Sequence, residues 1–245
     1  MKFDSREIQA LSAAQPVRFD LYAGIHKAMR AMMADALLAL GRLDVQDQAE
    51  ISAVSDQIAS LLDFCAKHVV HENDFVHAAI EARAAGASAA IAHEHEEHVT
   101  QIALLRATLS ALGQMGPGPQ ADTAALNLYR ELALFVASNF QHMHVEETAH
   151  NAVLWARYTD AELLALYDRL LASIPPAEMM HTLRWLVPYM NPAERTALLK
   201  DMQMHAPAPA FEAALDVVKP HLTTSDWAKL TRSLGLPPVA GLVMA

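Results

Sequence analysis

The sequence predicts an all-α protein, and three observations support this class. Gly is scarce, at 8 of 245 residues, whereas Ala, Leu and Met, which lose little conformational freedom in a helix, are abundant. Apolar residues recur at alternating spacings of three and four along the long segments, which is the period of one helix face. No segment shows the alternating apolar and polar pattern of a half-buried strand.

Four long helices are expected in the first part of the chain, joined as an up-down bundle. They are expected over residues 19–40, 51–83, 89–112 and 123–158. Gly41 closes the first helix, and a polar connection separates it from the second, which breaks near Gly86. The segment 113–120 after the third helix is a loop, because its Gly and Pro residues break helices.

Shorter helices are expected in a C-terminal extension that follows the bundle. Their start signals are Pro175-Pro176, Asn191-Pro192, the break at Pro207 and Pro209, and Thr224 or Ser225 as the cap of a helix that contains Trp227. The predicted organisation is therefore a bundle over residues 1–160, a helical extension over 161–235 and a loose tail over 236–245.

Histidine and glutamate side chains interrupt the apolar face of each bundle helix near its middle. In chain order these residues are His26, then His68 and Glu72, then His95 and His98, and finally His142 and Glu146. The midpoints between successive sets fall near Gln48, Arg83 and Gln120, each in or beside an expected connection. Residues equidistant from a short connection lie at one height in an up-down bundle, so the polar residues are expected to form one layer.

A buried layer of carboxylates and imidazoles predicts a metal site. An unpaired buried charge costs roughly several kcal/mol, and bound cations remove that cost. Imidazole nitrogen and carboxylate oxygen suit iron, and each carboxylate can bridge two metal ions. Each His-x-x-x-Glu pair places both donors one turn apart on the same helix face. The predicted ligands are His26, His68, Glu72, His95, His142 and Glu146, with His98 as a further candidate.

The other histidines lie off these faces or outside the bundle. Five histidines of the bundle are expected to be solvated or to support the ligands, namely His71, His77, His93, His144 and His150. The same is expected of Glu147. The histidines expected at the surface of the extension are His181, His205 and His221. Cys65 and Tyr22 lie one turn from predicted ligands, and core packing is the simpler role for Cys65.

The combined motif resembles the hemerythrin-like, or HHE cation-binding, family over residues 17–160. That family has His on its first helix, His-x-x-x-Glu on the second, His on the third and His-x-x-x-Glu or His-x-x-x-x-Asp on the fourth. The matching residues are His26, His68 with Glu72, His95 within IAHEHEEHV, and His142 with Glu146 within HMHVEET. The resemblance implies a hemerythrin-like four-helix bundle that holds two iron ions, oxo- or hydroxo-bridged.

The third helix departs from the pattern of the oxygen carriers in this family. Those proteins have His-x-x-x-His there, whereas Val99 lies four residues after His95, and Glu146 replaces the carriers' Asp. The chain is therefore more similar to bacterial or iron-sensing relatives. The resemblance implies a protein that senses, scavenges or handles O₂, NO or iron, with a small gas as ligand. The alternative is a di-iron oxidoreductase that acts on NO or peroxide or donates iron for cluster repair.

Other classes of protein fit the sequence less well. A metal-free interaction module would have apolar residues in place of the four central histidines, and a ferritin-like oxidase needs a Glu that the first helix lacks. A net charge of −10 argues against nucleic-acid binding. No apolar run or leader indicates a membrane span or a signal peptide, and a single cysteine, Cys65, fits a reducing compartment. A cytoplasmic protein is expected, and a protein partner or a homo-oligomer is left open.

Overall fold

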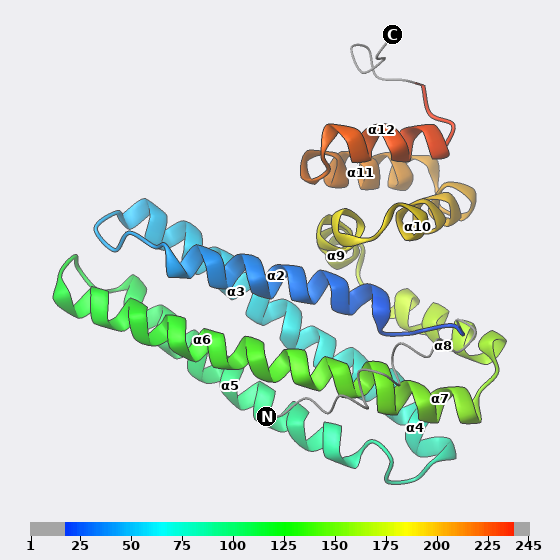
Figure 1. Ribbon diagram of the computed structural model, residues 1–245, viewed down its shortest axis with the longest axis horizontal. Helices are drawn as coiled ribbons and strands as arrows, with labels where there is room; N and C mark the ends of the chain where they lie inside the picture. The colour runs from blue at the N-terminus through cyan, green and yellow to red at the C-terminus, as the bar shows by residue number, and fades with distance from the viewer. Residues whose placement is uncertain (1–17, 238–245) are drawn as a thin grey trace, which may run out of the picture.

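The computed structural model describes residues 18–237, and this range is helical without any strand, which confirms the predicted fold class. Four long helical rods lie side by side as an up-down bundle (Figure 1). In chain order they are α2 (Ala23–Gly41); α3 (Gln48–His71) continued by α4 (Ala78–Arg83); α5 (Ala89–Gly113); and α6 (Pro119–Val145) continued by α7 (Asn151–Arg157).

Local capping explains where the bundle helices begin. α2 starts four residues later than predicted, because the side chain of Asp20 accepts the backbone N–H groups of Tyr22 and Ala23 ahead of the helix. α3 starts three residues earlier than predicted, because Asp47 caps it. α6 also starts early, at Pro119, since Pro is well suited to the first turn of a helix.

The second and fourth rods each contain a π-helical segment, Glu72–His77 and Glu146–His150, which the sequence analysis did not predict. Such a turn contains one extra residue and rotates everything after it by about 100° around the helix axis. The period-3.6 pattern read from the sequence continues the inner faces through Ala79 and Ala149, and this is wrong for Ala149, which is exposed. Ala79 is partly buried, and the fully buried residues at these levels are Ile80 and His150.

The extension consists of short helices with the expected start signals. They are α8 (Asp160–Ser173), α9 (Pro176–Tyr189), α10 (Pro192–His205), α11 (Ala208–Val218), a 3₁₀ turn (Lys219–His221) and α12 (Thr224–Ser233). Asn191 caps α10 as predicted. The cap of α12 is Thr223, not Thr224 or Ser225, because its hydroxyl accepts the Asp226 N–H. Pro209 lies inside the first turn of α11. Residues 238–245 of the predicted tail lie outside the described residues.

The polar layer of the bundle lies between two apolar clusters. The larger cluster fills the bundle toward the α2–α3 and α5–α6 connections and includes Met29 and Met143. The smaller cluster closes the other end and contains Leu163 and Leu166 of α8 together with Tyr22. The helices α9 to α12 share a separate core, and α9 also packs against α2 (Figure 1). No helix within residues 18–237 is long and apolar enough to cross a membrane.

Candidate metal centre

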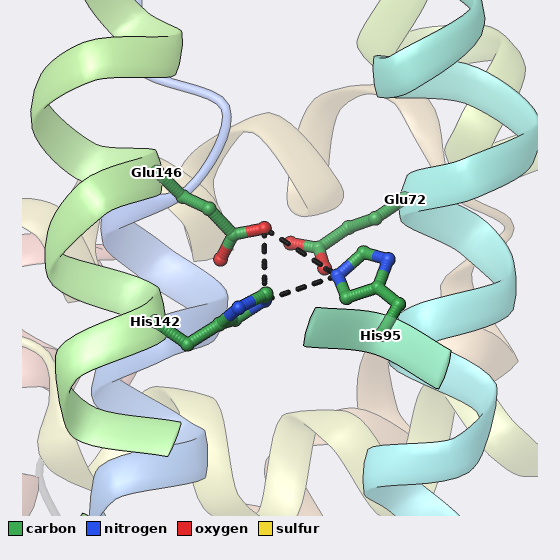
Figure 2. A group of neighbouring side chains, drawn as sticks. All are labelled: Glu72, His95, His142 and Glu146. Carbon is green, nitrogen blue, oxygen red and sulfur yellow. Dashed lines mark hydrogen bonds and ion pairs between the residues drawn. The ribbon is translucent and has the colours of Figure 1, made fainter. Parts of the chain in front are cut away.

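The structure brings the six predicted ligands together at one level of the bundle. His26 comes from α2, His68 and Glu72 from α3 and its π-helical continuation, His95 from α5, and His142 and Glu146 from α6 and its π-helical continuation. All are buried except His68, which is partly exposed. Figure 2 shows four of these side chains, from three separate rods, pointing toward one another.

The Glu72 carboxylate faces two groups of imidazoles with its two oxygens. Its Oε1 lies 3.0 Å from His68 Nε2 and 3.6 Å from His26 Nε2. Its Oε2 lies 3.3 Å from His95 Nε2, on the other side of the layer. The carboxylate therefore lies between the pair His26 and His68 on one side and His95 on the other.

The Glu146 carboxylate repeats this arrangement from the opposite rod. Its Oε2 lies 3.5 Å from His26 Nε2. Its Oε1 lies 3.3 Å from His142 Nε2 and 3.7 Å from His95 Nε2, and those two imidazole nitrogens are 3.0 Å apart. Two carboxylates thus separate two imidazole pairs, and each carboxylate presents one oxygen to each side.

Most donor atoms of this layer are unsatisfied. His26 Nε2, His68 Nε2 and all four carboxylate oxygens of Glu72 and Glu146 are buried and make no hydrogen bond with any residue of 18–237. Buried polar atoms in native proteins nearly always have a partner, and orphaned ones need an explanation. A cation satisfies nitrogen and oxygen acceptors together, so the donor set fits a bound metal ion.

Side chains behind the histidines hold them in orientation. Glu147 Oε1 accepts from His26 Nδ1 at 3.1 Å, and the Arg30 guanidinium donates to both Glu147 oxygens at 2.6 and 2.9 Å. His95 Nδ1 and Asn73 Oδ1 are 2.8 Å apart. Such partners fix the tautomer of a ligating imidazole, leaving Nε2 for the metal.

The same support holds the fourth-rod histidine, where Glu94 Oε2 lies 2.9 Å from His142 Nδ1. The supporting roles of Asn73, Glu94 and Arg30 were not predicted from the sequence. Glu147 was expected either to be solvated or to support a ligand, and it supports His26. One signal was available, because Asn73 and Glu147 each directly follow a predicted ligand in the chain.

Ionisation in the layer balances charge when no metal is bound. Burial lowers the pKa of His26, but the hydrogen bond to Glu147 and the nearby Glu72 carboxylate more than compensate and raise it to about 9. Burial also lowers the pKa of His95, but its contacts with Glu146 and Glu72 outweigh this effect and raise the pKa to about 9. Although burial raises the pKa of Glu72, its histidine neighbours hold the net value well below the usual range. A metal ion must therefore displace protons from the histidines, so its affinity increases with pH.

His98 is buried close to the layer but takes a different position from His95. Its ring packs edge-on against His142, with centroids 4.7 Å apart, and its Nε2 lies 3.3 Å from Ser138 Oγ. None of the metal-ligand groups found among the described residues includes His98.

We therefore expect His95→Ala to lose about one bound metal ion per chain, and His98→Ala to keep its full complement, because only His95 faces both carboxylates. The measurement is metal analysis after anaerobic reconstitution with ferrous iron. Each variant is the control for the other, since both remove a buried imidazole from α5. Metal loss confined to His98→Ala would reverse this ranking.

His77 and His150 were expected to be solvated or to support the ligands. Both are buried, which excludes a solvated position. The π-helical turn Glu72–His77 turns His77 toward the interior. With Glu146, the two histidines form a further group of potential ligands. His181, expected at the surface, is half-buried and lies 3.3 Å from Ser60 Oγ of the bundle. His93, His205 and His221 are exposed.

A largely apolar cavity of about 520 Å³ lies between the bundle and the extension. It is lined by residues of α2, α3, α8, α9 and α10, including Phe64, Leu171 and Leu186. Tyr22, His68 and Glu72 also line it, so the cavity reaches the polar layer. Small molecules can approach the layer from this side, through space that the extension encloses.

Fold and layer together define a cation-binding helical bundle, with buried His and Glu clusters suited to a metal site. Residues 18–150, more than half of the chain, match the Hemerythrin HHE cation binding domain. The chain belongs to this family, which confirms the resemblance found in the sequence. Neither a curated protein nor a solved structure matches it.

Proposed function

We propose that the layer holds two iron ions, one beside His26 and His68 and the other beside His95 and His142. The observation that carries this proposal is the orientation of the two carboxylates. Glu72 and Glu146 each present one oxygen to each imidazole pair, as a carboxylate must if it is to bridge two ions.

The donor chemistry supports iron, and the absence of thiolate from the ligand groups of the described chain agrees with it. Imidazole and carboxylate suit iron, whereas soft thiolates favour Cu(I), zinc and iron–sulfur clusters. Cys65 is buried one turn from His68, and burial raises the pKa of its thiol to about 12, so it stays protonated. A centre of this kind also suits a cytoplasmic, reducing environment, where a single cysteine remains free.

The proposed centre is open to small ligands. Two imidazole nitrogens and two carboxylate oxygens per ion leave about two positions on a six-coordinate ion. Ferrous ions bound there would supply coordination sites and electrons for O₂ or NO. The residues of the chain would hold these ions between two apolar clusters, limit water around them, and leave the apolar cavity at His68 and Glu72 as the approach for a gas.

We infer that the protein senses, scavenges or handles O₂, NO or iron, and is not a reversible oxygen carrier. A site with more open coordination positions than that of the oxygen carriers protects a bound gas less well. It therefore favours irreversible oxidation of the metal. An oxidoreductase that turns over NO or peroxide is the second candidate, favoured by a cavity with room for more than a diatomic gas. A protein partner that receives a signal or delivers electrons fits either role.

The test is rapid mixing of the anaerobically reduced, iron-loaded protein with O₂ while the visible spectrum is recorded. We expect prompt oxidation that is not reversed when O₂ is removed under vacuum, because about two positions per ion are accessible. A spectrum that returns to that of the reduced protein would contradict the proposal. Repeated mixing with NO or peroxide and a reductant separates the second candidate, since only an enzyme consumes many equivalents.

A further inference from the structure

We propose that His77, Glu146 and His150 form a third cation position, for a divalent first-row transition metal ion such as Fe²⁺ or Zn²⁺. The position shares Glu146 with the proposed two-iron layer, so it rests in part on that function. Its two imidazoles belong to neither pair of the layer, and they are the subject of the test.

The donor set is a compact group of two histidines and one carboxylate. One ligand atom from each of the three residues lies within 4.8 Å of the other two. His77, Glu146 and His150 are 5%, 0% and 2% exposed. Two imidazoles and one carboxylate bind ferrous iron or zinc and leave further positions for water or a ligand.

The π-helical segment Glu72–His77 completes this position. His77 follows Glu72 by five residues, and in a regular α-helix such residues point about 140° apart. The π-helical turn Glu72–His77 brings His77 back to the inner side of its rod. His150 follows Glu146 by only four residues, which point about 40° apart in a regular α-helix, so it lies on the inner side of its own rod without a similar correction. Because His68 and His142 precede the glutamates and His77 and His150 follow them, each rod carries imidazoles on both sides of its carboxylate.

The contacts of the two histidines favour ligand binding over a structural role. His77 is buried with its Nε2 unpaired among residues 18–237, although a histidine kept for structure normally has a hydrogen-bond partner. Its ring stacks on His95, with centroids 4.8 Å apart, and meets His150 edge-on at 5.3 Å. His150 Nδ1 pairs with the Tyr22 hydroxyl at 3.3 Å, so its other nitrogen is left for a metal.

The experiment is anaerobic equilibrium dialysis against ferrous iron, followed by metal and protein analysis. The proteins are the full-length chain, the double variant His77→Gln and His150→Gln, and the matched control His93→Gln and His205→Gln, which removes two exposed histidines. We expect about three ions per chain in the unmodified protein and the control, and about two in the double variant. Far-UV circular dichroism checks that each variant remains helical.

The outcomes separate this inference from the proposed function. About two ions in both the unmodified protein and the double variant would overturn the third position and leave the two-iron layer standing. Two ions in the unmodified protein and fewer in the double variant would also overturn it, and would assign the histidines to the layer. Three ions in both would show that the third lies elsewhere. Fewer than two in the unmodified protein would overturn both proposals, whatever the folding of the variant.

Discussion

Replacing both shared glutamates, with Glu72→Gln and Glu146→Gln in one chain, should abolish binding of both ions of the layer. Each carboxylate faces both imidazole pairs, so no single histidine has an equivalent role. The amides keep the shape of the side chains but lose the negative charge and the ability to bridge. We expect the metal content to fall from about two or more ions per chain to near zero, measured after anaerobic reconstitution with ferrous iron.

Two comparisons make this result specific. Glu96→Gln with Glu97→Gln removes two exposed carboxylates from α5 and should leave the metal content unchanged. His68→Ala should lose about one ion, because its imidazole faces only Glu72 Oε1. Retention of two ions by the double glutamate variant, with helical content intact, would contradict the proposed centre.

Removing the metal should lower the melting temperature by about 10 °C or more. The ligands come from four rods and converge only in the folded chain, so the free energy of metal binding contributes to the free energy of unfolding. Each ion at roughly a hundred times its dissociation constant adds about 2.7 kcal/mol, so two ions add about 5.4 kcal/mol. Each kcal/mol shifts the melting temperature by about 2–4 °C for a chain of this size. The measurement is thermal unfolding before and after treatment with a chelator.

The difference in melting temperature between the metal-bound and the metal-free protein should grow between pH 6.5 and 9. Without metal, His26 and His95 have pKa values of about 9, raised above the ordinary value of 6.5. Their contribution to stability is complete below pH 6.5 and is lost as the pH rises through 9. Metal affinity changes in the opposite direction, because protons compete less at higher pH. A melting temperature that the chelator leaves unchanged, or a difference that shrinks with pH, would count against the centre.

The extension gives the family bundle two features that bear on the metal layer. α8 packs against the π-helical segment Glu72–His77, and its Leu163 and Leu166 belong to the same cluster as Tyr22 and Val76. α9 packs against α2 and, with its neighbours, encloses the cavity that reaches the layer. The environment of the layer is therefore set by residues outside the matched range 18–150 as well as within it.

The sequence by itself determined the fold class and the convergence of six side chains. Period-3.6 patterns identified the inner face of each helix up to the ligands, and the Gly- and Pro-containing connections fixed the relative heights of His26, Glu72, His95 and Glu146. These inferences succeeded because helix period and loop position are local properties. Caps such as Asn191, which bonds to its own helix, were readable for the same reason.

Tertiary structure alone decided what lies immediately around those six residues. Glu94 reaches His142, and Glu147 reaches His26, from other helices, and no local pattern reports such contacts. The π-helical segments are the clearest case, because nothing in the letters ENDFVH or EETAH requires an extra residue in the turn. The irregular turns place both a carboxylate and a following histidine inside the bundle, so burial and contacts between rods, rather than helix propensity, determine which way His77 and His150 face.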